Sequence, residues 1–296
     1  MKTETLYIKN QEKFTSNLRN DQIYVDVKEV PMAELTGMPA TKRLEKAIVS
    51  EGQIVNVVSG QYGLLDNKNY FAKVEEKLIM ADIDYVTRSI NRNNGSFSVD
   101  YILKDPRYII NVANGKDKIL PMLSFTNSYD STCKTSGRLS FYREVCTNGL
   151  HVTQLTSIGF KVKHRGDVNE IVLPQLDSII ASFIENEYYS LSRKFEVLAE
   201  KKIDEKQLTT FIAILAKNTG LFSAERELKT KEVVPTKTAM DIIASIENEA
   251  NLVGTEINGW LVYNAFNQHL HNNIAKSFDN QKLIDEKIFN HILELA

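Results

Sequence analysis

The sequence predicts an α+β protein: an antiparallel β-rich N-terminal and central region with one packed helix, followed by an all-helical C-terminal region. Three observations support this fold class. Apolar residues recur with a period of two through much of residues 51–170. Turn-forming residues such as Asn94-Gly95 separate these runs. From Pro174 onward the period changes to 3.6, which is typical of amphipathic helices.

The composition limits the class of protein. The 296 residues are 43% hydrophobic and 25% charged, so the chain can bury a large core without disulfides or a structural metal. Two cysteines in a chain of this size indicate a reducing compartment. The N-terminal residues lack the apolar core of a signal peptide, and apolar runs are far shorter than a membrane helix. We therefore expect a cytoplasmic protein without membrane partners.

The N-terminal half is expected to form an arm and then a sheet. Residues 1–50 are predicted to be an N-terminal arm with a strand near 22–30, and 40–49 fit either a short helix or a strand. Residues 51–170 are predicted to be an antiparallel β-sheet domain. Its expected elements are a strand, a turn at Ser59-Gly60 and a second strand within 53–65, a helix at 69–80, hairpins at 84–103 and 108–126, and strands at 138–145 and 158–164.

The C-terminal half is expected to be helical. Residues 171–218 should form a long helix, beginning near Pro174, and a helical hairpin packed on the sheet. A linker is predicted at 219–235 and a C-terminal helical region at 236–296. Asp204 and Thr236 are candidate helix caps, and Gly220 a candidate helix end.

Charge is distributed unevenly along the chain. The net charge of −2 predicts no general attraction to nucleic acid. Residues 133–165, however, contain six basic residues and one acidic residue, whereas 166–206 contain nine acidic and five basic residues. Alternation along strand 158–164 places Lys161, Lys163 and Arg165 on one face, where three cations could follow a phosphate backbone.

The candidate nucleic-acid-binding residues are basic or aromatic residues in or near this segment. Tyr129 is a further residue on which an unpaired base could stack. A solvated face that protects a sheet edge would explain the same cations. The candidates are Arg88, Arg92, Arg138, Tyr142, Arg143, Lys161, Lys163 and Arg165.

Catalytic and metal chemistry have weaker support. Cys133, Cys146, His151 and His164 are zinc-capable, but they lack the close cysteine pair of a typical zinc site. Cys146 beside a histidine could act as a nucleophile, yet a free cysteine is more often a small buried hydrophobe. Phosphate-binding loops, dinucleotide fingerprints and nucleophile elbows are absent from the sequence. We expect a protein that is not an enzyme and needs no metal or cofactor.

Several segments resemble, in the expected order, the phage/plasmid-like protein family built on the domain of unknown function 932. They include Val58-Ser-Gly-Gln-Tyr62, Phe125-Thr-Asn-Ser-Tyr-Asp-Ser131, Arg143-Glu-Val-Cys146-Thr-Asn148-Gly149 and Lys163-His164-Arg-Gly166. Tyr129 and Ser131 depart from the His and Gly-Ser of the family pattern. The signature positions, most of which suit turns and are expected to be structural, are Tyr62, Asn127, Asp130, Cys146, Asn148, Gly149, His164, Gly166, Trp260 and Asn264.

The resemblance implies a phage, prophage or plasmid protein in a bacterial host cytoplasm, and it implies no established activity. With the basic segment, it favours a non-enzymatic protein that binds nucleic acid, single-stranded DNA more than duplex, during replication or recombination of a mobile element. Such a protein could form homo-oligomers. The alternative is an interaction protein that modulates a host defence or replication complex. Trp260, Tyr263 and Phe266 in 236–296 could anchor such a partner, although a stripe of this kind is more often part of a core.

Overall fold

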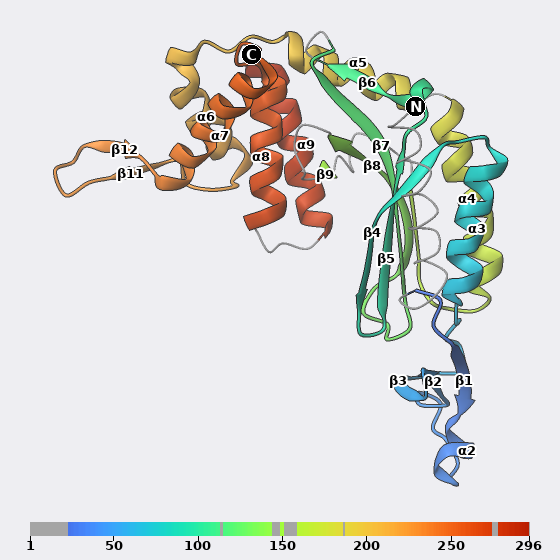
Figure 1. Cartoon of the computed structure of the whole chain (residues 1–296). Coiled ribbons are helices and arrows are strands. Elements are labelled where there is room, and N and C mark those ends of the chain that lie inside the picture. Colours follow the sequence, from blue (N-terminus) through green and yellow to red (C-terminus); the bar gives the residue numbers. More distant parts are fainter. Residues whose placement is uncertain are drawn as a thin grey trace. The chain divides into compact units, whose positions relative to one another are not determined.

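The computed structural model describes residues 23–112, 115–143, 149–150, 159–185, 187–273 and 278–295. These residues form two compact units (Figure 1). Unit 1 contains the described residues of 1–108, 121–139 and 158–185. Unit 2 contains those of 109–120, 140–157 and 186–296. The predicted α+β class is confirmed, since antiparallel sheets precede a mainly helical C-terminal half.

Unit 1 begins with a small three-stranded sheet. β1 (Val27–Pro31), β2 (Lys46–Ser50) and β3 (Gln53–Val58) pair in that order, and α2 (Met32–Thr36) joins the first two strands. Segment 40–49, which fitted either a short helix or a strand, is therefore a strand from Lys46 onward. The predicted turn at Ser59-Gly60 is confirmed, because Tyr62 N donates to Ser59 O. The second strand expected after that turn is wrong, and the chain runs without regular structure to Asp66.

The main sheet of unit 1 has the strand order β10-β8-β7-β5-β4. The hairpin predicted at 84–103 is confirmed as β4 (Tyr85–Asn93) and β5 (Ser96–Leu103), joined by Asn94-Gly95 with Asn94 at a φ of 51°. The remaining strands are β7 (Asp117–Ser128), β8 (Thr135–Arg143) and β10 (Gly159–Val162). β7 and β8 each contribute residues to both units.

The two long helices of unit 1, α3 and α4, pack side by side (Figure 1). α3 (Asn67–Met80) begins at Asp66, whose carboxylate accepts from Lys68 N. Its Tyr70 ring meets Phe125 of the sheet edge-on, with centroids 6.1 Å apart. α4 (Val168–Glu185) follows Asp167, which accepts from the backbone N of Asn169 and Glu170. The apolar face of the sheet, with Phe97, Val99, Tyr101 and Phe125, is buried.

The long helix predicted from Pro174 corresponds to α4 and α5 (Glu187–Glu200), the helical residues described on either side of residue 186, and its predicted start is wrong. Pro174 lies inside α4, because the Asp167 cap starts the helix six residues before it. The predicted linker at 219–235 is also wrong in part. It contains a two-stranded hairpin, β11 (Glu225–Glu227) and β12 (Val233–Pro235), with Arg226 opposite Val234.

Unit 2 is mainly helical. It contains α5, α6 (Leu208–Thr219), α7 (Lys237–Val253), α8 (Gly259–Asn273) and α9 (Phe278–Leu295). The short helical turns are η1 (Pro106–Tyr108) in unit 1 and η2 (Glu205–Gln207) in unit 2. In the same unit, β6 (Ile110–Val112) pairs with β7 and β9 (Gly149–Leu150) with β8. The predicted Thr236 cap is confirmed, and Gly220 ends α6 at a φ of 64°.

α8 is the central helix of unit 2. Trp260, Leu261, Val262, Tyr263, Phe266 and Leu270 have no exposed surface, and helices α5, α7 and α9 pack around them. The first turn of α8 carries four consecutive apolar residues, so it is stable only when it is enclosed in this way. Among the described residues, none of the helices has the length and apolar content to span a bilayer.

Candidate nucleic-acid interface

The main sheet of unit 1 has one apolar and one polar face. Ser96, Ser98 and Asp100 of β5 alternate with the buried Phe97, Val99 and Tyr101, so they project from the face opposite α3. The same alternation in the neighbouring strands extends this second surface. We call it the polar face.

A row of hydrogen-bonding side chains crosses the polar face through all five strands. Lys161 is opposite Ser136, Thr126 is opposite Ser98, and Ser98 is opposite Asn91. The hydroxyls of Thr126 and Ser136 are 2.7 Å apart and complete the row. All five residues are at least partly exposed. At normal strand spacing the row is about 19 Å wide.

A second row is centred on Asp100, which faces Ser124 on one side and Ser89 on the other. Ser89 Oγ donates to Asp100 Oδ2 at 2.7 Å, and Arg88 Nη1 lies 3.9 Å from the same oxygen. Arg138 is opposite Gly159 in this row and is half-buried. Burial lowers the pKa of Arg138, and the charge of Asp100 opposes that shift. Arg88 and Arg138 thus lie on the polar face. Asp100 is on β5, which lies between the strands that carry the two arginines.

Only one of the three cations predicted on strand 158–164 lies in a strand. Lys161 lies in β10, at one end of the strand order, but the strand ends at Val162. Lys163 and Arg165 lie in a tight turn in which Arg165 N donates to Lys163 O at 2.8 Å. All three cations are exposed, whereas the residues between them are half-buried. The predicted alternation of exposure is confirmed. Lys161 lies at one margin of the polar face, and Lys163 and Arg165 follow it in the turn after β10.

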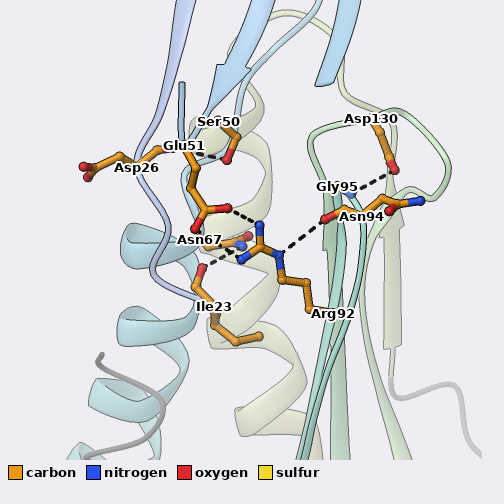
Figure 2. A network of polar contacts seen from close by, with 9 residues as sticks. All are labelled: Ile23, Asp26, Ser50, Glu51, Asn67, Arg92, Asn94, Gly95 and Asp130. Atoms are coloured by element: carbon orange, nitrogen blue, oxygen red, sulfur yellow. Dashed lines mark hydrogen bonds and ion pairs between the residues drawn. The ribbon is translucent and has the colours of Figure 1, made fainter. Parts of the chain in front are cut away.

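Arg92 has a different environment near the tip of the β4–β5 hairpin. Its guanidinium forms an ion pair with Glu51 in the β2–β3 turn and lowers the pKa of that carboxyl (Figure 2). Beside it, Gly95 N donates to Asp130 Oδ2 at 3.2 Å, which links this hairpin to the β7–β8 turn. Arg92 therefore joins neighbouring turns, and its charge is already matched by a carboxylate.

Arg143 does not lie on an accessible surface, and the prediction that it contacts nucleic acid is wrong. In unit 2 its side chain is only 1% exposed. Nε donates to Asp117 Oδ2 at 2.5 Å, and Nη1 pairs with Glu249 of α7. Trp260 Nε1 donates to the same Asp117 oxygen at 2.9 Å. These four side chains form a buried charged cluster, whereas the neighbouring Tyr142 is half-buried.

The signature residues of unit 1 form a connected buried network. Asn127 Nδ2 donates to Leu65 O and to Asn67 Oδ1, both at 2.8 Å. Thr135 Oγ1 lies 2.9 Å from Asn127 Oδ1 and 3.3 Å from His164 Nε2. His164 Nδ1 lies 3.2 Å from Gly63 O, so we assign the ring proton of a neutral His164 to Nδ1. The network joins β7 and β8 to the segment that precedes α3.

The Tyr62 and His164 rings extend this network by stacking, with centroids 5.2 Å apart and planes 8° apart. The Tyr62 hydroxyl donates to Ser128 O at 3.1 Å. Burial lowers the pKa of His164, while its bond to Gly63 O acts in the opposite direction. Burial also raises the pKa of Tyr62 to about 12. Both side chains are therefore neutral at physiological pH, as expected for a structural network.

Glycine is required where the segment after β10 meets the one before α3. A Cβ on Gly63 would lie 2.2 Å from Gly166 O, and Gly166 itself has a φ of 68°. Gly166 N donates to Gln61 O at 2.9 Å. Gly63 therefore allows the close approach of the two segments, and the signature Gly166 supplies the positive φ.

Tyr129 cannot stack on bases, so that prediction is wrong. It has no exposed surface, and its hydroxyl accepts from Asn67 N at 2.9 Å. Burial raises its pKa. Asp130 closes a turn by accepting from Thr132 N at 3.0 Å. Both residues of this signature element have structural partners.

The remaining signature residues belong to unit 2. Trp260 is in the charged cluster, and Asn264 Nδ2 donates to Trp260 O within α8 at 2.8 Å. Gly149 lies in β9. Cys146, Asn148 and His151 lie outside the described residues. Of the four zinc-capable residues, the structure therefore describes only Cys133 and His164. Cys133 is half-buried, and burial raises the pKa of its thiol.

A comparison with known protein families identifies the family of this chain. A family model described as "Domain of unknown function (DUF932)" matches residues 54–287. The chain belongs to the DUF932 family. Neither the curated proteins nor the solved structures contain a match. Membership of the DUF932 family assigns no activity to the polar face.

Sequence reasoning had missed most of the polar face, although the signal was present. Ser96, Ser98 and Asp100 alternate with apolar residues in a single strand, and Ser124 and Thr126 do so in the next. Period-two alternation indicates which residues share a face. The register that aligns these residues into rows depends on strand pairing, which local patterns do not define.

Proposed function

We propose that this DUF932 protein is a non-enzymatic nucleic-acid-binding protein, with single-stranded DNA as its preferred ligand. The observation that carries the proposal is the polar face, a row of hydroxyl and amide groups bordered by Lys161, Lys163 and Arg165. The resemblance to phage and plasmid proteins supports a proposed role in the replication or recombination of a mobile element.

The chemistry of the face fits a sugar-phosphate chain. Exposed cations at one margin attract phosphates without selecting a sequence. Serine, threonine and asparagine side chains offer donors and acceptors to phosphate and sugar oxygens. Arg138 and Arg88 add positive charge within the face, where Asp100 partly balances them.

The alternative function as a host-interaction protein lacks its predicted anchor. Trp260, Tyr263 and Phe266 have no exposed surface, so they cannot provide a docking stripe. The prediction that they contact a partner is wrong, because all three fill the core around α8. Nucleic-acid binding therefore remains the better-supported proposal.

The test is a fluorescence-anisotropy titration of labelled single-stranded and duplex DNA across a series of salt concentrations. We expect single-strand binding that weakens steeply with salt, since each released counterion contributes to the slope. The double variant Lys161→Ala/Lys163→Ala should bind at least about fivefold more weakly and show a salt slope smaller by roughly 1–2.

The matched control is Lys217→Ala/Lys229→Ala, which removes the same charge from exposed positions of unit 2. It should bind like the wild type at every salt concentration. Equal loss in both double variants would mean that net charge alone governs binding. Absence of wild-type binding at low salt would contradict the proposed function.

A further inference from the structure

We infer that the polar face binds a nucleic acid through its sugar-phosphate backbone, and that the bases do not stack on the protein. This inference rests on the proposed function and specifies what that face recognises. It follows from the distribution of aromatic rings between the two faces of the sheet in unit 1.

The aromatic residues of the five strands within unit 1 all lie on the helix-covered face. Tyr85 and Tyr101 meet edge-on at 5.6 Å, and Tyr101 and Phe125 lie 6.0 Å apart. A Cβ on Gly137 would lie 2.6 Å from both Phe125 and Phe160, which places the Phe160 ring in the same layer. Phe97 also belongs to it and is 3% exposed.

Base recognition on a sheet ordinarily depends on aromatic platforms, because every base has a face that can stack. On the polar face, the corresponding positions hold short polar side chains. Ser98, Thr126 and Ser136 reach only a few ångströms from the backbone, and the Thr126 and Ser136 hydroxyls already contact each other. These groups suit the oxygens of phosphate and sugar, which repeat identically along any strand.

Charge at the margin supports the same orientation of the ligand. Lys161, Lys163 and Arg165 attract phosphates toward the sheet edge. If the backbone lies along these cations and the hydroxyl row, the base edges point away from the protein. A bound strand would then keep its pairing edges accessible.

The experiment compares three labelled 30-nucleotide single strands in anisotropy titrations at low salt. One is oligothymidine, one is an abasic phosphodiester of the same length, and one is oligothymidine with uncharged methylphosphonate linkages. We expect the abasic strand to bind within about threefold of oligothymidine and the methylphosphonate strand at least tenfold more weakly. Lys161→Ala/Lys163→Ala should weaken the first two by the same factor.

The outcomes separate the two proposals. Even one stacked base would weaken the abasic strand by about fivefold or more, so a larger loss than that overturns backbone recognition while the proposed function stands. Strong binding of the methylphosphonate strand would also overturn it. If none of the three strands binds, the proposed function fails and the inference fails with it.

Discussion

Arg138 and Arg143 lie five residues apart on β8 and have opposite environments. Arg138 is half-buried on the polar face of unit 1. Arg143 is 1% exposed in unit 2, held by Asp117 and Glu249. Because successive side chains of a strand alternate, an odd separation places the two arginines on opposite faces. A basic stretch in the sequence is therefore not one surface, and the parity of each position decides whether its charge is available to a ligand.

Removal of Arg143 should have the largest effect on stability. Arg143→Ala leaves the buried Asp117 without its cation, and loss of one partner from a buried pair costs about 3–5 kcal/mol. Arg138→Ala should cost less than about 1 kcal/mol. Urea denaturation followed by far-ultraviolet circular dichroism measures both. Equal losses for the two variants would contradict the contrast between their environments.

Substitution of Asp285 should have the next largest effect on the free energy of unfolding, and that effect should depend on pH. It is buried in α9, accepts from Tyr263 and Asn267, and its pKa is raised to about 7, first by desolvation. The folded state thus holds a proton that the unfolded state releases above about pH 4, so stability falls between pH 4 and pH 7. Asp285→Asn should stabilise the protein at pH 8 by roughly 2–4 kcal/mol relative to its effect at pH 4.

The control for this prediction is Asp241→Asn, an exposed change on α7. At pH 8 it should change the free energy of unfolding by less than about 0.5 kcal/mol, because it alters an exposed side chain. A stability difference between Asp285→Asn and the wild type that is the same at both pH values would show that folding does not raise the pKa of Asp285.

Gly137→Ala should have a smaller effect that distinguishes the two faces of β8. The new methyl would lie 2.6 Å from the Phe125 and Phe160 rings, and overpacking of this kind costs about 1–3 kcal/mol. Ser136→Ala, on the polar face next to it, should cost less because it removes one partly exposed hydroxyl. Thermal denaturation compares them. A lower Tm for Ser136→Ala than for Gly137→Ala would reverse the assignment of the faces.

The smallest effect on stability is expected at the candidate binding residues. Lys161→Ala/Lys163→Ala alters exposed side chains, so the free energy of unfolding should change by less than about 0.5 kcal/mol. Chemical denaturation of the same preparation used for binding measures this. A loss of several kcal/mol would assign these lysines to the fold and not to a ligand.

Much of the sheet could be predicted from local patterns. The Asn94-Gly95 turn and the alternation in β5 identify a hairpin, and the Thr236 cap and Gly220 locate helix ends. The alternation of side chains along β8 also predicts that Arg143 is buried. It shares a face with Leu139 and Phe141, which have no exposed surface. That signal was outweighed by the basic character of the segment.

Other features depend on contacts between distant residues. Pro174 suited a first helical position, but the Asp167 cap begins α4 earlier. The stripe of Trp260, Tyr263 and Phe266 is more typical of a core than of an interface, and its packing partners confirm that it belongs to the core. The Asn127–Thr135–His164 network joins residues 37 positions apart at its ends, which turn propensities alone cannot locate.

The most direct test of the polar face is photocrosslinking from its centre. A benzophenone amino acid replaces Ser98 in one variant and Asn69, exposed on α3, in another. Each is irradiated with labelled single-stranded DNA at low salt. The account predicts a crosslink from position 98 that disappears on addition of unlabelled strand, and little or none from position 69. Crosslinking from position 69 alone, or equally from both, would contradict binding on the polar face.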